Sequence, residues 1–390
     1  MRIAGVVAEY NPFHNGHLFH LQKTRENGAD AVVAVMSGNF VQRGEAAILD
    51  KWARAEAAAK SGVDLVLELP VYWATGGAQM FASGAVSVLR HLGCVDMLSF
   101  GSECGDISHI CQAAEAVEKP ETAFHMQTLL QTGMPFAAAR TQAIRTFCPE
   151  AAEVLQNPND TLAVEYCLAA KRCGAEFLLS AVKRIGAAHD SSVTAGQYAS
   201  ASEVRECLVC GTDYAPYCPP ETVCLLKAAC ADGTAPASLK TLERMLLAKL
   251  RTTSPQQIAA LPDVSEGLEN RISDAARQAH DLESLYAFCK TKRYPLSRIR
   301  RILLSFLLDI RAADIPADVP YIRVLAIGER GAEILHHAKR TADLPVYTKM
   351  AGVTDSVFEA ECRASEIYGL LTPKVVPAGA EWTKQIYVQK

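Results

Sequence analysis

Apolar segments alternate with amphipathic segments from residue 2 to residue 103. The segments "RIAGVVAEY", "ADAVVAVMSG", "VDLVLELPV" and "CVDMLSFGSE" are largely apolar at successive positions, whereas the segments between them place apolar residues three or four positions apart. A strand that is apolar on both faces has to be covered on both faces, as in a parallel sheet with helices on either side. The alternation therefore predicts an α/β fold with a Rossmann-like parallel sheet.

Helical patterns replace this alternation further along the chain. Residues 106–172 are mainly helical in pattern, and "AEFLLSAVKRI" (175–185) predicts one more strand before a helix at 202–210. The proline-rich "YAPYCPPET" then indicates a linker. We therefore predict a sheet-bearing domain (1–212) and a mainly α-helical domain (213–390). The expected elements of the second domain are helices at 221–231, 236–250, 254–260, 266–289, 296–312 and 330–340, with a possible strand at 321–328.

Composition and charge exclude several classes of protein. The chain has 390 residues, 49% of them hydrophobic, and a formal net charge of −4. No apolar stretch reaches the roughly 18 residues that span a membrane, and the N-terminus resembles a first strand more than a signal peptide. We therefore expect a cytoplasmic protein without a membrane partner. Of the thirteen cysteines, Cys207 and Cys210 form a pair inside an expected helix with no histidine nearby, so we expect no metal site.

The segment "EYNPFHNGHLFH" (9–20) follows the first strand and begins the first helix. Ligands of parallel sheets bind beyond the carboxyl ends of the strands, and the free N–H groups of a helix N-terminus attract phosphate. Gly16 allows close backbone approach, and His14 and His17 can each offer a ring N–H to a phosphoryl oxygen. The pattern predicts an anion site. Two alternatives stay open, namely His17 and His20 as metal ligands and all three histidines as incidental polar caps.

Two short motifs resemble signatures of the nucleotidyltransferase superfamily. His14-Asn15-Gly16-His17 is similar to the HxGH signature, whose histidines contact the α- and β-phosphates of ATP during adenylyl transfer. "SASEVR" (200–205) is similar to the second signature, ISSTxIR, whose serines and arginine hold the outer phosphates. This second motif departs from the superfamily pattern at Glu203.

Longer segments resemble one bacterial family, the tRNA(Met) cytidine acetate ligases. The resemblance implies a nucleotidyltransferase-like α/β domain followed by a helical domain. It also implies an enzyme that forms acetyl-adenylate from ATP and acetate, with Mg²⁺ as an expected cofactor. The enzyme would then acetylate N4 of the wobble cytidine in elongator tRNA(Met), and DNA is not an expected partner. The segments are "EYNPFHNGH", "MSGNFVQRGEAAILDKWARAEAA", "GVDLVLELP", "FGSE", "NPND", "VKRIGAAHD" and "RYPLSRIRR".

The resemblance carries over to individual residues. His14, His17 and Arg205 are the expected catalytic residues. Gly101 of "FGSE" matches a contact with the nucleotide, since a missing side chain lets adenosine approach the sheet. The expected ATP-binding residues are Val7, Ala8, Glu9, Tyr10, Asn11, Pro12, Phe13, His14, Asn15, Gly16, His17, Leu18, Phe19, His20, Gly101, Asn159 of "NPND", Arg184 of "VKRIG", Ser200 and Ser202.

Several polar residues keep two interpretations each. Gln42 and Arg43 follow the second strand and contact phosphate or RNA, or else belong to a solvated loop. Glu9 ends the first strand, where it orients His17 or binds Mg²⁺, or else caps a loop.

A second group of polar residues also allows two interpretations. Asp50 is expected to cap a helix, with Lys51 and Arg54 as a surface pair behind it, unless Lys51 contacts ATP. His189 and Asp190 form a polar turn, or else line an acyl pocket.

The segment "KTKRYPLSRIRR" (290–301) combines basic residues with Tyr294. Basic side chains that follow phosphates, together with an aromatic ring for stacking, are typical of RNA binding. A basic helix face exposed to water is the alternative. With the family resemblance, we expect tRNA to be bound by Lys290, Lys292, Arg293, Arg298, Arg300 and Arg301.

Two other functions agree with parts of this pattern. An adenylyltransferase acting on a small phosphorylated metabolite would use the same two signatures, but it would need neither the basic segment nor a helical domain. A non-catalytic RNA-binding protein with a vestigial nucleotide fold is disfavoured, because His14, Gly16, His17 and Arg205 are all intact.

Overall fold

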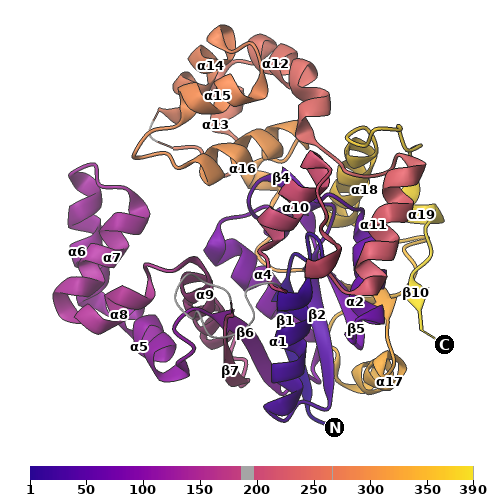
Figure 1. Cartoon of the computed structure of the whole chain (residues 1–390). Helices are drawn as coiled ribbons and strands as arrows, with labels where there is room; N and C mark the ends of the chain where they lie inside the picture. Colours follow the sequence, from indigo (N-terminus) through magenta and orange to yellow (C-terminus); the bar gives the residue numbers. More distant parts are fainter. Residues whose placement is uncertain (186–196, 266, 390) are drawn as a thin grey trace.

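An eight-stranded sheet forms the centre of the molecule, with the strand order β10-β8-β5-β2-β1-β6-β7 and β9 beside β8 (Figure 1). The computed structural model describes residues 1–185, 197–265 and 267–389, so His189 and Asp190 lie outside the described residues. The strands β1, β2, β5, β6 and β7 are mutually parallel, which confirms the predicted Rossmann-like sheet. Their bounds are β1 (Ile3–Ala8), β2 (Ala31–Ser37), β5 (Leu65–Leu69), β6 (Met97–Ser102) and β7 (Leu178–Lys183).

Three strands from the last 70 or so residues join this same sheet. The expected strand at 321–328 is β8 (Ile322–Ile327), which pairs antiparallel with β5. Both β9 (Val346–Tyr347) and β10 (Tyr387–Val388) pair parallel with β8. The division of the chain at residue 212 stays a prediction, but the sheet takes strands from both sides of it.

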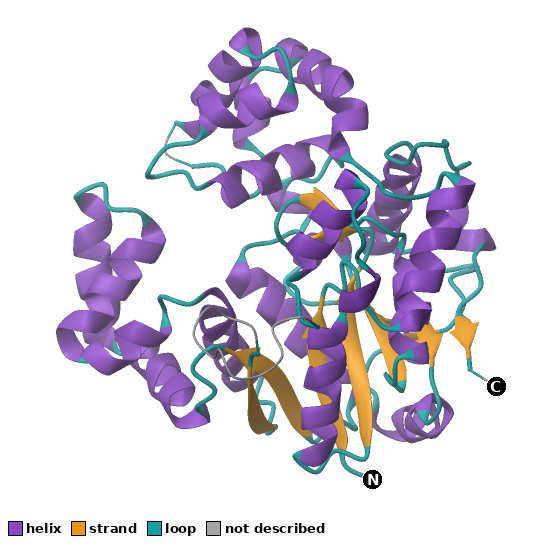
Figure 2. Cartoon of the chain, in the orientation of Figure 1, coloured by secondary structure: helices purple, strands orange, loops and turns teal. Residues whose placement is uncertain are grey.

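Successive residues of the central strands face opposite helical layers, because side chains alternate along a strand. In β2, Val33 and Val35 contact the core shared with α4, whereas Val32 and Ala34 contact the core shared with α1 and α2. Both faces are therefore covered, as the apolar strands predict (Figure 2). The helices around the sheet are α1 (Asn15–Glu26), α2 (Lys51–Lys60), α3 (Val71–Ala74), α4 (Ala78–Leu92), α9 (Pro158–Arg172), α10 (Ala201–Cys210), α11 (Pro220–Asp232), α17 (Gly331–Thr341), α18 (Ser356–Gly369) and α19 (Ala380–Thr383).

Two groups of helices project from the sheet, at the left and the top of Figure 1. The first is α5 (Ile107–Glu118), α6 (Pro120–Gln131), α7 (Phe136–Phe147) and α8 (Pro149–Val154). The second, here called the helical unit, has a hydrophobic core of its own. It consists of α12 (Glu243–Thr252), α13 (Pro255–Ala259), α14 (Leu268–Gln278), α15 (Leu282–Cys289) and α16 (Leu296–Leu307). The single helix expected at 266–289 is wrong, because the backbone is extended at Ala279 and Asp281 caps a new helix, α15.

A small hairpin of β3 (Phe40–Val41) and β4 (Glu45–Ala46) follows β2 and was not anticipated. It is too short and too polar at its tip to show strand periodicity. Three 3-10 turns complete the described elements, at Ala215–Tyr217, Leu239–Leu242 and Ala312–Asp314.

A buried cluster of charges holds the C-terminal strands and helices to the sheet. Lys51 of α2 forms ion pairs with Glu68 and Glu381, and its Nζ atom lies 3.5 Å from a carboxyl oxygen of Glu361. The Lys51 side chain is fully buried. Arg323 of β8 pairs with Glu68 and Glu381 in the same cluster. Removing one partner from such a group would leave uncompensated charge in the interior.

The expectation that Lys51 and Arg54 form a surface pair is therefore wrong. Arg54 is also 0% exposed, and Asp50 caps α2 as expected. Lys51 and Arg54 lie on the helical face that carries Ala55 and Ala58, which packs against the sheet. Charge on a buried face signals internal partners, but a helical pattern alone does not say where those partners come from.

The cluster makes stability depend on pH. Burial, together with the Glu68 and Glu381 carboxylates, raises the pKa of Glu361 from 4.5 to about 8. Between these values the folded protein keeps a proton that the unfolded chain releases, so stability falls as pH rises toward 8. From about pH 6.5 to pH 8, this one group should lower the free energy of unfolding by up to about 1.4 kcal/mol per pH unit. We predict that Glu361→Gln removes this slope in urea unfolding curves.

The control is Glu359→Gln, which changes an exposed carboxylate on the same helix and should keep the wild-type slope. Equal slopes in the wild type and in Glu361→Gln would contradict the assignment of the proton to Glu361.

Candidate functional site

A cavity of about 1030 Å³ opens at the carboxyl edge of the sheet. The ends of β1, β6 and β7 line it, together with the N-terminal turns of α1, α4, α9 and α10 and the tip of the β3–β4 hairpin. This is where a parallel sheet binds its ligands. Of the expected ATP-binding residues, those that line the cavity are Val7, Ala8, Glu9, Tyr10, His14, Gly16, His17, Phe19, His20, Gly101, Asn159, Arg184 and Ser200.

The two histidines of the HNGH segment cap α1 reciprocally. The Nδ1 atom of His14 accepts a hydrogen bond from the Gly16 N–H at 3.0 Å, and the Nδ1 atom of His17 accepts one from the His14 N–H at 3.2 Å. The two rings lie 3.8 Å apart between centroids. Because both Nδ1 atoms act as acceptors, the proton of each neutral ring is on Nε2. The helix N-terminus thus carries two ring N–H donors beside its own free N–H groups.

Both rings are neutral at pH 7. Burial, together with Arg184 and Arg205, lowers the pKa of His14 to about 4. Burial, with His14, His20 and Arg184, lowers the pKa of His17 well below its ordinary value of 6.5. Stacking at this distance is therefore not opposed by repulsion between two positive charges. The pair can act on an anion through hydrogen bonds and dipoles.

Gly16 is required by the His14 ring. A Cβ at Gly16 would lie 2.8 Å from Cε1 of His14, which is closer than real Cβ contacts allow, and 3.0 Å from Nδ1 of the same ring. Any side chain here would displace the ring from its capping position. The glycine therefore keeps the His14 ring in its capping position and also lets a ligand approach the backbone.

His20 lies one turn further along α1 and is tied to the sheet. Its Nε2 atom is 3.1 Å from the Ser99 hydroxyl, which lies 2.7 Å from the Thr24 hydroxyl. Thr24 in turn donates to the carbonyl of His20 at 2.8 Å. His20 lines the cavity, but its ring nitrogen already has a partner in β6.

The segment 200–205 caps α10 and contacts the loop that carries His14 and His17. Ser200 and Glu203 form a capping box, with the Glu203 N–H donating to the Ser200 hydroxyl at 3.2 Å. This explains the departure at Glu203, since a glutamate at this position completes the box. Arg205 donates to the carbonyl of Asn11 at 2.8 Å and to the Ser202 hydroxyl at 3.1 Å. Neither Arg205 nor Ser202 lines the cavity.

Gly101, Asn159 and Arg184 meet on the opposite wall. Glu103 accepts from the Asp160 N–H at 2.9 Å and from the Asn159 amide, while Asp160 accepts from the Glu103 N–H at 2.9 Å. This reciprocal pairing joins the end of β6 to the start of α9. A Cβ at Gly101 would make only ordinary contact with Arg184, at 3.5 Å, so the protein itself does not demand a glycine there.

Five other expected ATP-binding residues support the loop instead of lining the cavity. The Asn11 Oδ1 atom accepts from the Ile48 N–H at 2.9 Å, and Asn15 donates to the carbonyls of Gln197 and Pro216. Phe13 is fully buried. Pro12 and Leu18 belong to this group as well.

Some cavity residues were not singled out from the sequence. The apolar residues Phe81, Phe100, Leu162 and Tyr166 line the cavity from α4, β6 and α9. They occur in ordinary helical and strand patterns, which do not distinguish a cavity wall from a core. Gln42 and Arg43, which the sequence analysis did single out, also line the cavity.

Glu9 supports the hairpin, in agreement with a loop cap. Its Oε1 atom accepts from the Gln42 N–H at 2.9 Å. Burial raises the pKa of Glu9, and Arg43, Arg205 and Arg54 partly offset that effect.

Three arginines of the basic segment are held by protein contacts. Arg298 donates to the carbonyl of Asp263 at 2.7 Å, Arg301 pairs with the Asp263 carboxylate at 3.0 Å, and Arg300 pairs with Glu45. Lys290 and Lys292 are exposed, and Arg293 is half-buried.

In the part of the chain that the structure describes, no group of three or more His, Cys, Asp or Glu side chains is placed to hold a metal ion. None of the helices in the described ranges is long and apolar enough to cross a membrane.

The comparisons with known proteins agree over the whole chain. Residues 1–381 match the family described as HIGH Nucleotidyl Transferase. The tRNA(Met) cytidine acetate ligase of Thermoanaerobacter sp. (strain X514) is 40% identical, with 98% of each chain covered. The protein of that name from Clostridium kluyveri is 37% identical, with 96% of each chain covered. The crystal structure of Thermotoga maritima TmcAL bound with alpha-thio ATP is 32% identical and has a TM-score of 0.92, with 100% of each chain covered.

The histidine pair predicts an NMR result. In ligand-free protein at about pH 6, His14 should be neutral with its proton on Nε2, because its pKa is about 4 and Nδ1 accepts from Gly16. Long-range ¹H–¹⁵N spectra of histidine-labelled protein report the tautomer and the pKa. In Gly16→Ala the ring is displaced toward water, so the pKa of His14 should rise toward 6.5.

The spectrum of His14→Asn assigns the signal. Asparagine keeps an N-cap acceptor, so this variant should remain folded. A wild-type His14 that titrates near 6.5, or a proton found on Nδ1, would contradict the capping geometry.

Proposed function

This chain belongs to the HIGH nucleotidyltransferase family, among the tRNA(Met) cytidine acetate ligases, and we propose that it activates acetate with ATP and acetylates N4 of the wobble cytidine in elongator tRNA(Met). The reaction would proceed through acetyl-adenylate, in the cytoplasm, where ATP and tRNA are available. The observation that carries the proposal is the pair of neutral Nε2–H donors, His14 and His17, at a helix N-terminus that opens into the cavity.

In the first step, a carboxylate oxygen of acetate attacks the α-phosphorus of ATP and pyrophosphate leaves. Negative charge develops on the phosphoryl oxygens, so fixed N–H donors and cations accelerate the step. We assign this role to His14 and His17, with the free N–H groups of α1. Arg184 lines the same cavity and has no carboxylate partner among the described residues, which leaves its guanidinium available for phosphate. Arg205 holds the loop that carries the histidines. We propose that its guanidinium reaches the outer phosphates from behind that loop.

In the second step, N4 of the cytidine attacks the acetyl carbon, a C–N bond forms, and AMP leaves as the C–O bond breaks. N4 gives up a proton in this step. Glu9 is a lining carboxylate whose pKa burial raises, which suits it to accept that proton. The apolar wall of Phe81, Phe100 and Leu162 suits the acetyl methyl group.

The remaining nucleotide contacts are proposed from where each residue lies relative to the cavity. Gly101 and Asn159 line the wall of β6 and α9, where adenosine fits against a residue without a side chain. Ser200 and Ser202, at the start of α10, face the outer phosphates in this proposal. Asn11, Pro12, Phe13, Asn15 and Leu18 keep the loop in place without lining the cavity.

The described residues do not offer Mg²⁺ a site of their own. Glu9 lies among Arg43, Arg54 and Arg205, which oppose a bound cation. Mg²⁺ commonly binds through substrate phosphates and water. It therefore enters the proposal only as the counter-ion of ATP, and no step above passes through it.

The basic segment is proposed to bind tRNA. Lys290 and Lys292 are its exposed residues, Arg293 is half-buried, and Arg300 is partly exposed. Arg298 and Arg301 fix the segment by their contacts with Asp263. The helical unit would thus bring the anticodon to the cavity.

The proposed activity has a direct assay. Purified protein, ATP, labelled acetate and tRNA(Met) should yield acetylcytidine, and tRNA(Met) without the wobble cytidine should stay unlabelled. His14→Asn, which keeps the helix cap but lacks the ring N–H, should lower the rate at least about 100-fold. Pyrophosphate release that requires a phosphorylated metabolite would instead support an adenylyltransferase, and absence of any turnover would support a non-catalytic RNA-binding protein.

The tRNA contact predicts a separate effect. Lys290→Glu with Lys292→Glu should raise KM for tRNA about tenfold or more, because each reversal replaces a phosphate contact with repulsion. Acetate-dependent exchange of pyrophosphate into ATP, measured without tRNA, should not change. The matched control reverses two exposed lysines elsewhere, Lys119→Glu with Lys227→Glu, and should leave KM near the wild-type value.

A further inference from the structure

The β3–β4 hairpin has the cavity on one side and α16 on the other. Gln42 and Arg43, at its tip, line the cavity. Gly44 has a φ of 74°, and a Cβ there would lie 2.5 Å from backbone atoms of both Arg300 and Arg301. The hairpin therefore packs directly against the backbone of α16. A displacement of this helix would move the hairpin tip that lines the cavity.

The carboxylate of Glu45 lies between two arginines from distant parts of the chain. Its Oε1 atom pairs with Nη1 of Arg300 on α16, and its Oε2 atom is 3.9 Å from Nη2 of Arg205 on α10. Arg205 also contacts Ser202, whose hydroxyl lies 3.5 Å from Nη1 of Arg43. One carboxylate is therefore shared by an arginine of the proposed phosphate site and an arginine of the proposed tRNA surface.

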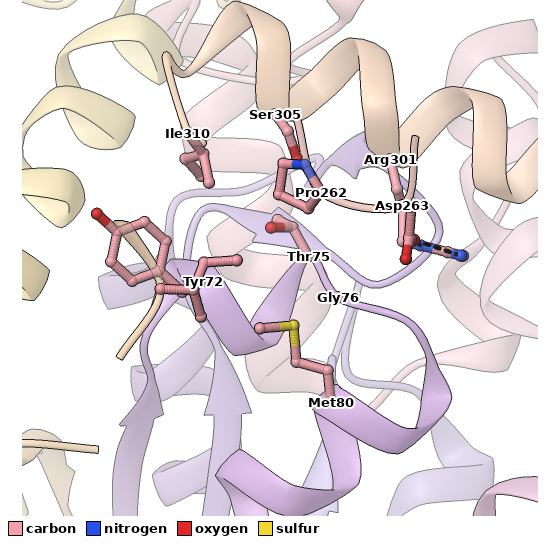
Figure 3. A pocket seen from close by; sticks show the side chains of 10 residues that line it. Tyr72, Thr75, Gly76, Met80, Pro262, Asp263, Arg301, Ser305 and Ile310 are labelled. Carbon is pink, nitrogen blue, oxygen red and sulfur yellow. Dashed lines mark hydrogen bonds and ion pairs between the residues drawn. The ribbon is translucent and has the colours of Figure 1, made fainter. Parts of the chain in front are cut away.

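Other contacts keep α16 in place without touching Arg205. Figure 3 shows the ion pair of Arg301 with Asp263, close to Gly76 and Met80 at the entry to α4. The guanidinium of Arg300 lies 5.3 Å from the ring centroid of Tyr286. Both contacts lie within the helical unit, and neither involves Glu45.

The ion pairs of Glu45 with Arg300 and Arg205 are partly exposed to water, which limits their contribution to stability. The side chains of Glu45, Arg300 and Arg205 are 31%, 26% and 18% exposed. A solvent-exposed ion pair changes a folding or binding equilibrium constant by only up to about fivefold. A change of that size matters little for folding, but it is enough to alter the binding of a ligand that competes for one of the arginines.

We propose that Glu45 is a positioning residue that makes nucleotide binding and tRNA binding oppose each other. This rests on the proposed function. A phosphate of tRNA that takes Arg300 leaves Glu45 to pair with Arg205 alone, which weakens the hold of Arg205 on the nucleotide phosphates. Equally, a nucleotide that takes Arg205 strengthens the pair of Glu45 with Arg300. Coupling between two sites is reciprocal, so each ligand lowers the affinity for the other by the same factor.

The coupling is measured as the Kd of fluorescent tRNA(Met), with and without saturating α,β-methylene-ATP. In the wild type the nucleotide analogue should raise this Kd about two- to fivefold. Glu45→Gln keeps the shape but removes the charge, and should bring the ratio close to one. Glu45→Asp should restore part of the effect. Thermal unfolding of both variants should stay close to the wild type, because the pairs are partly exposed.

Asp263→Asn is the matched control, since it breaks an arginine pair on the same helix that does not reach Arg205. It should keep the wild-type ratio. A ratio of one or below in the wild type, an unchanged ratio in Glu45→Gln, or equal loss in Asp263→Asn would each overturn the proposal. Acetylation of tRNA by the wild type is assayed in parallel, so that a wild type that acetylates tRNA but shows no coupling refutes the role of Glu45 and leaves the proposed function standing.

Discussion

The guanidinium of Arg54 satisfies four backbone carbonyls at the carboxyl edge of the sheet. It donates to the carbonyl oxygens of Glu9, Ser37 and Gly38, and its Nε atom donates to that of Leu49. A carbonyl where a strand ends has lost its ladder partner and needs another donor. The fixed fork of an arginine supplies several donors at once. Because the histidine loop and the hairpin both begin at these carbonyls, these two parts of the cavity lining depend on this one buried side chain.

The chemistry of the site depends on the two uncharged imidazole rings, His14 and His17, at the start of α1. Two charged imidazoles 3.8 Å apart would repel each other, whereas two neutral rings can stack. Their Nδ1 atoms are occupied by backbone N–H groups, so each ring keeps one N–H donor for a ligand. Positive charge comes from arginines instead. Of these, Arg184 lines the cavity, while Arg205 is shared between the loop carbonyl of Asn11 and the carboxylate of Glu45.

Local signals predicted the sheet and the capped turn. The apolar strands indicated β1, β2, β5, β6 and β7, and the HNGH segment indicated a helix N-terminus suited to an anion. These features depend on residues a few positions apart. By contrast, the antiparallel pairing of β8 with β5, the burial of Lys51 and the pairing of Arg300 with Glu45 were not predicted. Lys51 and Glu361 are 310 residues apart, and Glu45 and Arg300 are 255 apart.

Pattern and motif were thus sufficient for the fold class, the position of the anion site and, through family resemblance, the expected substrates. They could not say which charged side chains face water. A helix period shows that Lys51 shares a face with buried alanines, and a basic segment shows that six cations lie close together. Whether such a charge is buried, paired or free depends on the carboxylates that folding brings to it. In this molecule those carboxylates come from β4, β5, α18 and α19, which no local pattern connects to α2 or α16.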